Sequence, residues 1–403
     1  MKFFYKNFFR FVVLIAICAG FMSSTYAQDS SRLRISLLTC TPGEELYSIF
    51  GHSAVRVTDS NSVTDHVYNF GTFNFDDEGF YLKFLRGKLN YMISLDQFED
   101  FKNDYIAQNR GITEQELIFS GEEKINIRNA LNENLKEENK YYLYNFFLDN
   151  CTTRLRDIIV KNHRPLPALP YAMPAGSTFR DGLHKYQDLS DRPWTKIGMD
   201  LLLGTPADDV MTPAQQSYLP DNLMFSLAGV KNTPIISTTK NLYSITTEKN
   251  GKVIFTPLFF FTALLIVFIL LSLSQNVLIK KILTGLDGFV FFTVGLFGIV
   301  FAVMWVGTDH YMMKNNYNLL WGWPMHIVYA FFINKNTKRV RTYSLLTAVF
   351  LVLLLCAWFF LAQEMHNALI PLVMLMIYRS GVRFLSPQRK ESREVSQSDD
   401  RII

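Results

Sequence analysis

The distribution of apolar residues constrains this chain more than any other feature of its sequence. Long apolar runs lie at the extreme N-terminus and again after Lys252, while the residues between them are mixed in polarity. The overall hydrophobic content of 49% is near a globular average and hides this division. A chain of 403 residues with this pattern has room for one sizeable soluble domain followed by a membrane bundle.

The charge of the chain argues against a nucleic-acid partner. The formal net charge is +4, and 19% of the residues are charged. A nucleic-acid-binding protein needs a concentrated basic face. We therefore expect no nucleic-acid partner.

Residues 1–27 have the pattern of a secretory signal peptide. Basic residues, among them Lys2 and Arg10, precede the apolar run Phe11–Phe21, and small residues follow up to Ala27. An uncleaved anchor helix is the alternative interpretation. Both interpretations send the chain from Gln28 onward across the membrane.

Residues 251–384 predict a transmembrane domain of about five helices. Lys252–Leu273 and Gly285–Val306 are each long enough to cross a hydrocarbon core of about 30 Å, and Leu319–Ile333 is shorter. The runs are Lys252–Leu273, Gly285–Val306, Leu319–Ile333, Tyr343–Leu361 and a fifth from about Asn367 through Tyr378.

Basic residues in the loops predict the orientation of these spans. If residues 28–250 lie outside, the loop with Lys280, the loop with Lys338 and Arg341, and the end of the chain with Arg389 lie inside. Lysine and arginine are enriched in cytoplasmic loops. We therefore expect a multi-pass protein of the cell inner membrane, with residues 28–250 in the periplasm and a cytoplasmic tail at 385–403.

Two segments of the middle region predict a β-hairpin. Ser53–Val57 alternates between polar and apolar residues, and Val63–Phe70 follows after a turn-rich sequence. Folding this hairpin would bring Tyr68 or Asn69 opposite His52.

Three further segments of the middle region have interpretable patterns. Leu33–Leu37 alternates as a half-buried strand does, and Glu122–Asn139 has the spacing of a solvated amphipathic helix. Phe80–Leu95 is rich in aromatic and aliphatic residues, which predicts a strand and helix of the core. A lipid-contacting face is the alternative for this last segment.

Cys151 is the strongest candidate for a chemically active residue. The apolar spacing in Thr152–Val160 predicts a helix, so Cys151 would lie in its first turn. The N–H groups and dipole at a helix N-terminus lower the pKa of a thiol and favour a nucleophilic thiolate. The alternative in an oxidising compartment is a disulfide between Cys40 and Cys151.

A thiol nucleophile needs a base, and His52 is the best candidate for it. It stands beside Gly51 at the start of a predicted strand, where a small neighbour leaves room for a substrate. We expect His66, His163 and His184 to be surface residues.

Four motifs follow one another along residues 28–250. They are Cys40-Thr41-Pro42-Gly43, the segment Ser48–Val57, Val67-Tyr68-Asn69-Phe70-Gly71 and Asn150-Cys151-Thr152-Thr153. In this order they resemble the Lnb-type periplasmic domain of bacterial lipoprotein N-acyltransferases. The resemblance runs from about Arg32 to Val230, and the multi-span C-terminal region matches the layout of that family.

The resemblance implies an α+β fold with a permuted papain-like soluble domain, similar to lecithin-retinol-acyltransferase-like enzymes, followed by an all-α transmembrane bundle. Carried over residue by residue, it implies Cys151 as the nucleophile and His52 as its base. We choose Asn69 as the third, orienting residue, and Tyr68 and Asp65 stay open as alternatives.

The implied activity is a lipoprotein N-acyltransferase without metal or organic cofactor. An acyl chain from a membrane phospholipid would pass through a Cys151 thioester to the N-terminal amine of a diacylated lipoprotein. One rival is a periplasmic thiol hydrolase, either a phospholipase or a cell-wall amidase, that uses the same Cys151 and His52. The other rival is a non-enzymatic assembly or sensor protein with a Cys40–Cys151 disulfide.

Overall fold

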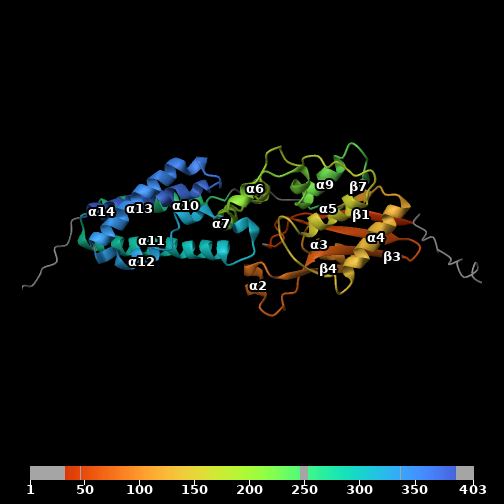
Figure 1. Cartoon of the computed structure of the whole chain (residues 1–403), viewed down its shortest axis with the longest axis horizontal. Helices are drawn as coiled ribbons and strands as arrows, with labels where there is room; N and C mark the ends of the chain where they lie inside the picture. Colours follow the sequence, from red (N-terminus) through yellow and green to blue (C-terminus); the bar gives the residue numbers. More distant parts are fainter. Residues whose placement is uncertain (1–31, 46, 246–252, 336, 387–403) are drawn as a thin grey trace, which may run out of the picture.

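The computed structural model describes residues 32–45, 47–245, 253–335 and 337–386, and these residues form two adjoining parts (Figure 1). One part is a β-sheet covered by helices, and the other is a bundle of apolar helices. This arrangement confirms the expected α+β class with a membrane bundle. The expected signal peptide at 1–27 and nearly all of the expected tail at 385–403 lie outside the described residues.

The sheet has seven strands in the order β6-β4-β3-β2-β1-β5-β7, and each neighbouring pair among the described residues is antiparallel. The β2–β3 hairpin confirms the predicted one. The strands are β1 (Leu33–Cys40), β2 (His52–Asp59), β3 (Thr64–Thr72), β4 (Asn90–Gln97), β5 (Ile112–Leu117), β6 (Tyr141–Leu143) and β7 (Ile236–Tyr243).

Helices cover both faces of this sheet. One face packs on α4 (Gly121–Leu135), α5 (Cys151–Asn162) and α9 (Pro220–Ala228), and the other packs on α3 (Phe98–Ala107). The central strand β1 is therefore buried on both faces, whereas its alternating sequence had predicted a half-buried strand. The remaining helices of this part are α2 (Phe80–Arg86), α6 (Phe179–Leu189), α7 (Pro193–Leu202) and α8 (Pro213–Gln216).

The bundle contains α10 (Pro257–Ser272), α11 (Val277–Val306), α12 (His326–Phe332), α13 (Lys338–Ala357) and α14 (Ile370–Leu385). Three described stretches are long and apolar enough to cross a membrane, namely Val277–Val306, Lys338–Phe360 and Asn367–Leu385. The apolar helix α10 is shorter.

The expected span Leu319–Ile333 differs from the structure. It holds a short 3-10 turn and then the seven-residue helix α12. Gly322 and Pro324 lie between the two, and proline cannot continue a helix because it lacks the amide hydrogen. The number of about five spans therefore stays a prediction.

Hydrogen bonds join the sheet part to the bundle after α7. The side chain of Gln363 donates to the carbonyl oxygen of Leu203 over 3.0 Å, and the amide of Gly204 donates to Met312 over 2.8 Å. A Cβ atom at Gly204 would lie 1.8 Å from the carbonyl oxygen of Lys314, so only glycine fits this contact.

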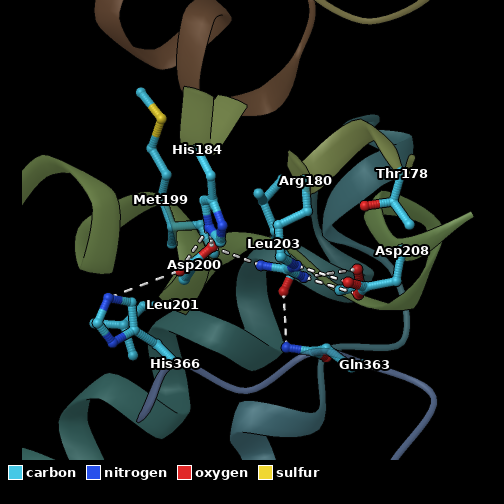
Figure 2. A network of polar contacts seen from close by, with 12 residues as sticks. Thr178, Arg180, His184, Met199, Asp200, Leu201, Leu203, Asp208, Gln363 and His366 are labelled. Carbon is cyan, nitrogen blue, oxygen red and sulfur yellow. Dashed lines mark hydrogen bonds and ion pairs between the residues drawn. The ribbon is translucent and has the colours of Figure 1, made fainter. Parts of the chain in front are cut away.

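A buried network of charged side chains lies at the same junction (Figure 2). Arg180 contacts Asp200 over 2.7 Å and Asp208 over 2.8 Å, and its side chain is fully buried. His184 of α6 lies 2.9 Å from Asp200, and His366, from the bundle, lies 4.0 Å from it. Burial alone would raise the pKa of Asp200, but His184 and Arg180 together outweigh burial and lower that pKa.

Candidate functional site

Cys151 is the first residue of α5, as the sequence predicted. The preceding Asn150 caps the helix. Its side chain accepts a hydrogen bond from the amide of Thr153 over 2.8 Å, and the hydroxyl of Thr153 accepts one from the amide of Asn150 over 2.8 Å. The side-chain nitrogen of Asn150 also donates to the carbonyl oxygens of Phe146 and Tyr218. The cap thus fixes the start of the helix and the position of the thiol.

His52 is the first residue of β2 and is half-buried. The register of β2 and β3 pairs Val55 with Tyr68, and its extension places Gly71 opposite His52. Neither Tyr68 nor Asn69 is therefore the direct cross-strand neighbour of His52. Asn69 is its diagonal neighbour on the same face of the sheet, because side chains alternate between the two faces along a strand.

Gly71, near the end of β3, lies next to Cys151. It lies at an irregularity in the β3–β4 pairing, with φ of +89°. A Cβ atom at this position would lie 3.5 Å from the Cβ atom of Cys151 and 3.7 Å from the ring of Tyr144. These distances are those of ordinary van der Waals contact, so it is the positive φ, which residues with a side chain rarely adopt, that favours glycine beside Cys151.

The imidazole of His52 lies between two partners. It is close enough to the thiol of Cys151 for the two groups to shift each other's pKa, and its Nε2 is hydrogen-bonded to Oδ1 of Asn69. The amide nitrogen of Asn69 in turn donates to Asp96 over 3.3 Å. Cys151, His52, Asn69 and Asp96 therefore form one continuous chain of contacts.

The electrostatics of the pair favour a thiolate and an imidazolium. Burial would raise the pKa of Cys151, but the charge of His52, its hydrogen bond and the backbone N–H of Ser53 lower that pKa to about 7. Burial would lower the pKa of His52, but Cys151 and Asn69 raise it above its usual value. Opposite charges at close range stabilise each other in this way. A thiolate is the nucleophilic form of cysteine.

The other cysteine of this part is free and buried. Cys40 lies opposite His52 in the register of β1 and β2, and burial raises the pKa of its thiol to about 12. Cys151 is also free, so the disulfide between these two cysteines is not formed in the structure. Only one of the two thiols has the electrostatic setting of a nucleophile.

The two other candidates for the orienting position have partners elsewhere. Tyr68 is buried in the core and donates to Asn132 over 2.6 Å. Asp65 accepts two hydrogen bonds from Arg56, over 2.7 and 2.6 Å. The hydrogen bonds of these two side chains are therefore made with residues other than His52.

The expectation that the remaining histidines lie at the surface is only partly right. His66 is half-exposed and contacts Gln97. His163 is buried and packs against Phe119, and His184 belongs to the junction network. Among the described residues, no group of three or more histidine, cysteine or acidic side chains is arranged to hold a metal ion.

Sequence reasoning missed three contributors to the site. Asp96 lies on β4, Gly71 at the end of β3, and Ser53 beside His52. The hydroxyl of Ser53 also accepts a hydrogen bond from Thr152 over 3.1 Å, which ties β2 to the first turn of α5. The glycine in the Asn69-Phe70-Gly71 motif was the available signal, but its role depends on a cross-strand register.

Two family models match this chain in the order of its two parts. Residues 21–179 match the Lnb N-terminal periplasmic domain, and residues 248–391 match the Lnb transmembrane domain. No curated relative and no solved structure matches. The matches confirm the resemblance and place the sheet part in the periplasm and the bundle in the membrane. The chain therefore belongs to the Lnb family of lipoprotein-modifying membrane enzymes.

Proposed function

We propose that this protein is a lipoprotein N-acyltransferase of the inner membrane and that Cys151, His52 and Asn69 carry its chemistry. The observation that supports this most strongly is the contact chain at the N-terminus of α5, where a thiol with a lowered pKa meets a histidine held by an amide. A cysteine nucleophile, an adjacent histidine base and a third group that orients the base form an arrangement typical of covalent catalysis through a thioester.

In the first step the Cys151 thiolate attacks an ester carbonyl of a membrane phospholipid. The carbonyl oxygen becomes an oxyanion, and the N-terminus of α5 stabilises it through the N–H groups at Cys151 and Thr152, since the N–H of Thr153 is already bonded to the Asn150 cap. The ester C–O bond then breaks. His52 gives its proton to the departing oxygen, so a lysophospholipid leaves and the acyl chain stays on Cys151 as a thioester.

In the second step the N-terminal amine of a diacylated lipoprotein attacks this thioester. His52 takes a proton from the amine, a C–N bond forms and the C–S bond breaks. The products are an N-acylated lipoprotein and the original thiolate–imidazolium pair. Asn69 contributes by holding the imidazole ring in the orientation that serves both steps.

Both substrates are anchored in a bilayer, which suits a catalytic domain fixed to a membrane bundle. The junction after α7 keeps the sheet part next to the bundle through backbone contacts. A rigid attachment of this kind would hold the thiol close to the headgroups of the outer leaflet. It would thereby raise the frequency of productive encounters with lipid substrates.

The test is intact-mass spectrometry of one lipoprotein from cells that lack this protein and carry wild type, Cys151→Ser, His52→Ala or Cys356→Ser. We expect wild type and Cys356→Ser to restore an N-acyl chain, since Cys356 lies on a membrane helix. Cys151→Ser should restore none, and His52→Ala should restore at most a small fraction.

A second readout uses the purified full-length protein with a phospholipid that carries a labelled acyl chain. We expect a hydroxylamine-sensitive acyl adduct on the peptide that contains Cys151. If labelled free fatty acid and lysophospholipid form while no amine is acylated, the protein is a thiol hydrolase and the proposal is wrong. Equal restoration by Cys151→Ser would show that the assigned site is wrong.

A further inference from the structure

The side chains of the short helix α2 are not part of a hydrophobic core. None of its seven residues is buried, so the prediction of a core helix is wrong for this element. Its apolar side chains are largely exposed, with 80% for Tyr81, 60% for Leu82 and 54% for Phe84, and Phe75 just before the helix is 61% exposed. A concentration of large apolar side chains at a surface marks an interaction site.

The C-terminal end of α2 is attached to the point where α11 ends. The amide of Asp309 donates to the carbonyl oxygen of Arg86 over 2.9 Å, and Nε2 of His310 donates to that of Phe84 over 3.1 Å. The hydrophobic helix α11 ends at Val306, three residues before this contact. Figure 1 shows α2 beside the junction, at the bundle-facing end of the sheet part.

This attachment sets the depth of α2 relative to the membrane. If α11 spans the bilayer, the residues just after Val306 lie at the periplasmic surface of the membrane. The exposed side chains of α2 are then at the level of the outer leaflet. Aromatic and aliphatic residues at this level partition into the boundary between headgroups and acyl chains.

A row of aromatic rings leads from α2 to the candidate site. Phe80 contacts Phe73 with ring centroids 5.7 Å apart, Phe73 contacts Tyr91 at 5.2 Å, and Tyr91 stacks on Tyr144 at 4.2 Å. The ring of Tyr144 and the side chain of Cys151 both lie next to Gly71. Phe73, Tyr91 and Tyr144 are only half-buried, so each of them keeps some surface that an apolar ligand could contact.

We propose that α2 inserts its apolar side chains into the outer leaflet and that the row Phe73-Tyr91-Tyr144 guides one acyl chain of a glycerolipid to Cys151. The insertion of α2 is independent of the enzymatic activity. The guidance of the acyl chain rests on the proposed acyl transfer through Cys151. The lipid that α2 contacts is thus also the source of the chain that reaches the thiol.

The insertion is tested by placing a single cysteine on α2. Leu82→Cys, in a Cys151→Ser/Cys356→Ser background, is labelled with an environment-sensitive fluorophore and placed in vesicles of phosphatidylethanolamine and phosphatidylglycerol. The matched control is Val63→Cys. Val63 is 90% exposed and lies in the turn before β3, about 30 Å from the end of that strand at Thr72.

We expect brominated lipids in these vesicles to quench the fluorophore at position 82 and to leave the one at position 63 unquenched. Pure lipid vesicles contain no other protein, so quenching identifies lipid as the partner. Equal behaviour of the two labels would overturn the insertion of α2. This readout does not depend on any acyl transfer.

The guidance of the acyl chain is tested with Leu82→Glu/Leu85→Glu in an otherwise native chain. We expect acyl-Cys151 formation from vesicle phospholipid to fall by about tenfold or more, because the burial of even one leucine side chain corresponds to such a factor. Loading from a monomeric short-chain phospholipid should stay at the level of wild type, and Val63→Glu should change neither rate.

Equal losses with both donors would assign α2 a merely structural role and overturn the guidance. Equal rates for Leu82→Glu/Leu85→Glu and wild type with vesicles would overturn it as well. If wild type forms no acyl-Cys151 from either donor, the proposed function and the guidance fail together. The quenching experiment still decides the insertion in that case.

Discussion

At the scale of single residues, the two free cysteines of the periplasmic domain have opposite properties. Both are buried, and burial disfavours a thiolate in each. Cys40 keeps a raised pKa, while the charge and hydrogen bond of His52 bring the pKa of Cys151 down to about 7. The difference between the pKa values of the two thiols therefore depends mainly on the imidazole of His52, with smaller contributions from Ser53 and Thr152.

This difference predicts the pH dependence of Cys151 alkylation by iodoacetamide in the full-length protein. The thiolate is the reactive form, so the rate should fall as the pH decreases through about 7. In His52→Ala the profile should move to higher pH, to the ordinary thiol value of about 8.5 or above, because burial remains and the positive charge is lost. Peptide mass spectrometry assigns the modified residue.

Cys40→Ser is the control, and its profile should match that of wild type. An unchanged profile in His52→Ala would show that the imidazole does not lower the pKa of Cys151.

At the scale of elements, the N-terminus of α5 links local stability to the candidate site. Asn150 closes the capping box and also donates to two backbone carbonyl groups, so it holds both the helix and the loop before it. A second capping box, at Ser120 of α4, has the same reciprocal pattern at an exposed position away from Cys151. The two caps therefore form a matched pair for mutagenesis.

Replacing either cap with alanine should lower the free energy of unfolding by about 1 kcal/mol. The decrease should be larger for Asn150→Ala, because this variant also removes two hydrogen bonds to backbone carbonyl groups. Only Asn150→Ala should slow the formation of acyl-Cys151, because only this cap positions the thiol. Thermal unfolding in detergent and the labelled-phospholipid reaction measure the two effects. A comparable loss of activity in Ser120→Ala would mean that the reaction rate follows the overall stability of the protein and does not depend on the position of the N-terminus of α5.

The elements that sequence reasoning predicted well are those with short-range signals. The β2–β3 hairpin and the start of α5 follow from local alternation and spacing. Asn69 was chosen from the same hairpin, but its diagonal placement depends on a register that the turn residues alone do not specify. Asp96 reaches the site through a third strand, and such a contact has no signature in its own segment.

The apolar segments were harder to interpret for a different reason. Apolar composition indicates burial, but it does not say whether protein or lipid provides the covering. The Phe80–Leu95 segment contains both a half-buried strand and a helix without any buried residue. In Leu319–Ile333 one proline divides the expected helix, and hydropathy summed over the segment does not register this break.

At the scale of the whole molecule, each of the two parts contributes buried side chains to a hydrophobic core of the other. Ile197 of α7 packs within the core of the bundle, and Met312 of the bundle packs among residues of the periplasmic domain. The Arg180–Asp200 pair lies at this shared boundary with almost no solvent exposure. The domain boundary expected near residue 250 therefore separates the two parts along the sequence, while their hydrophobic cores include residues from both sides of it.

Asp200→Ala should lower the free energy of unfolding by about 3–5 kcal/mol, because it leaves buried positive charge with one partner fewer. Asp188→Ala is the control. Asp188 pairs with Lys196 between the same two helices, but it is 63% exposed, so its loss should cost about 1 kcal/mol or less. Equal losses in the two variants would contradict a stabilising role for the buried network.

The lowered pKa of Asp200 also fixes the pH range of this effect. A carboxyl group whose pKa is lower in the folded protein contributes its full stabilisation above the unfolded value of about 3.9 and loses it as the pH falls through the folded value. The difference between wild type and Asp200→Ala should therefore be constant near neutral pH and decrease only in acid. Thermal unfolding at a series of pH values measures it.

The hydrogen bond from Gln363 to Leu203 has a consequence for the order in which the molecule is made. The two residues are 160 positions apart, so the ribosome reaches Gln363 on the order of 10–30 s after Leu203. This hydrogen bond can form only after Gln363 has been made. The attachment of α7 to the bundle is therefore one of the later contacts in the assembly of the molecule, since it depends on a residue near the end of the chain.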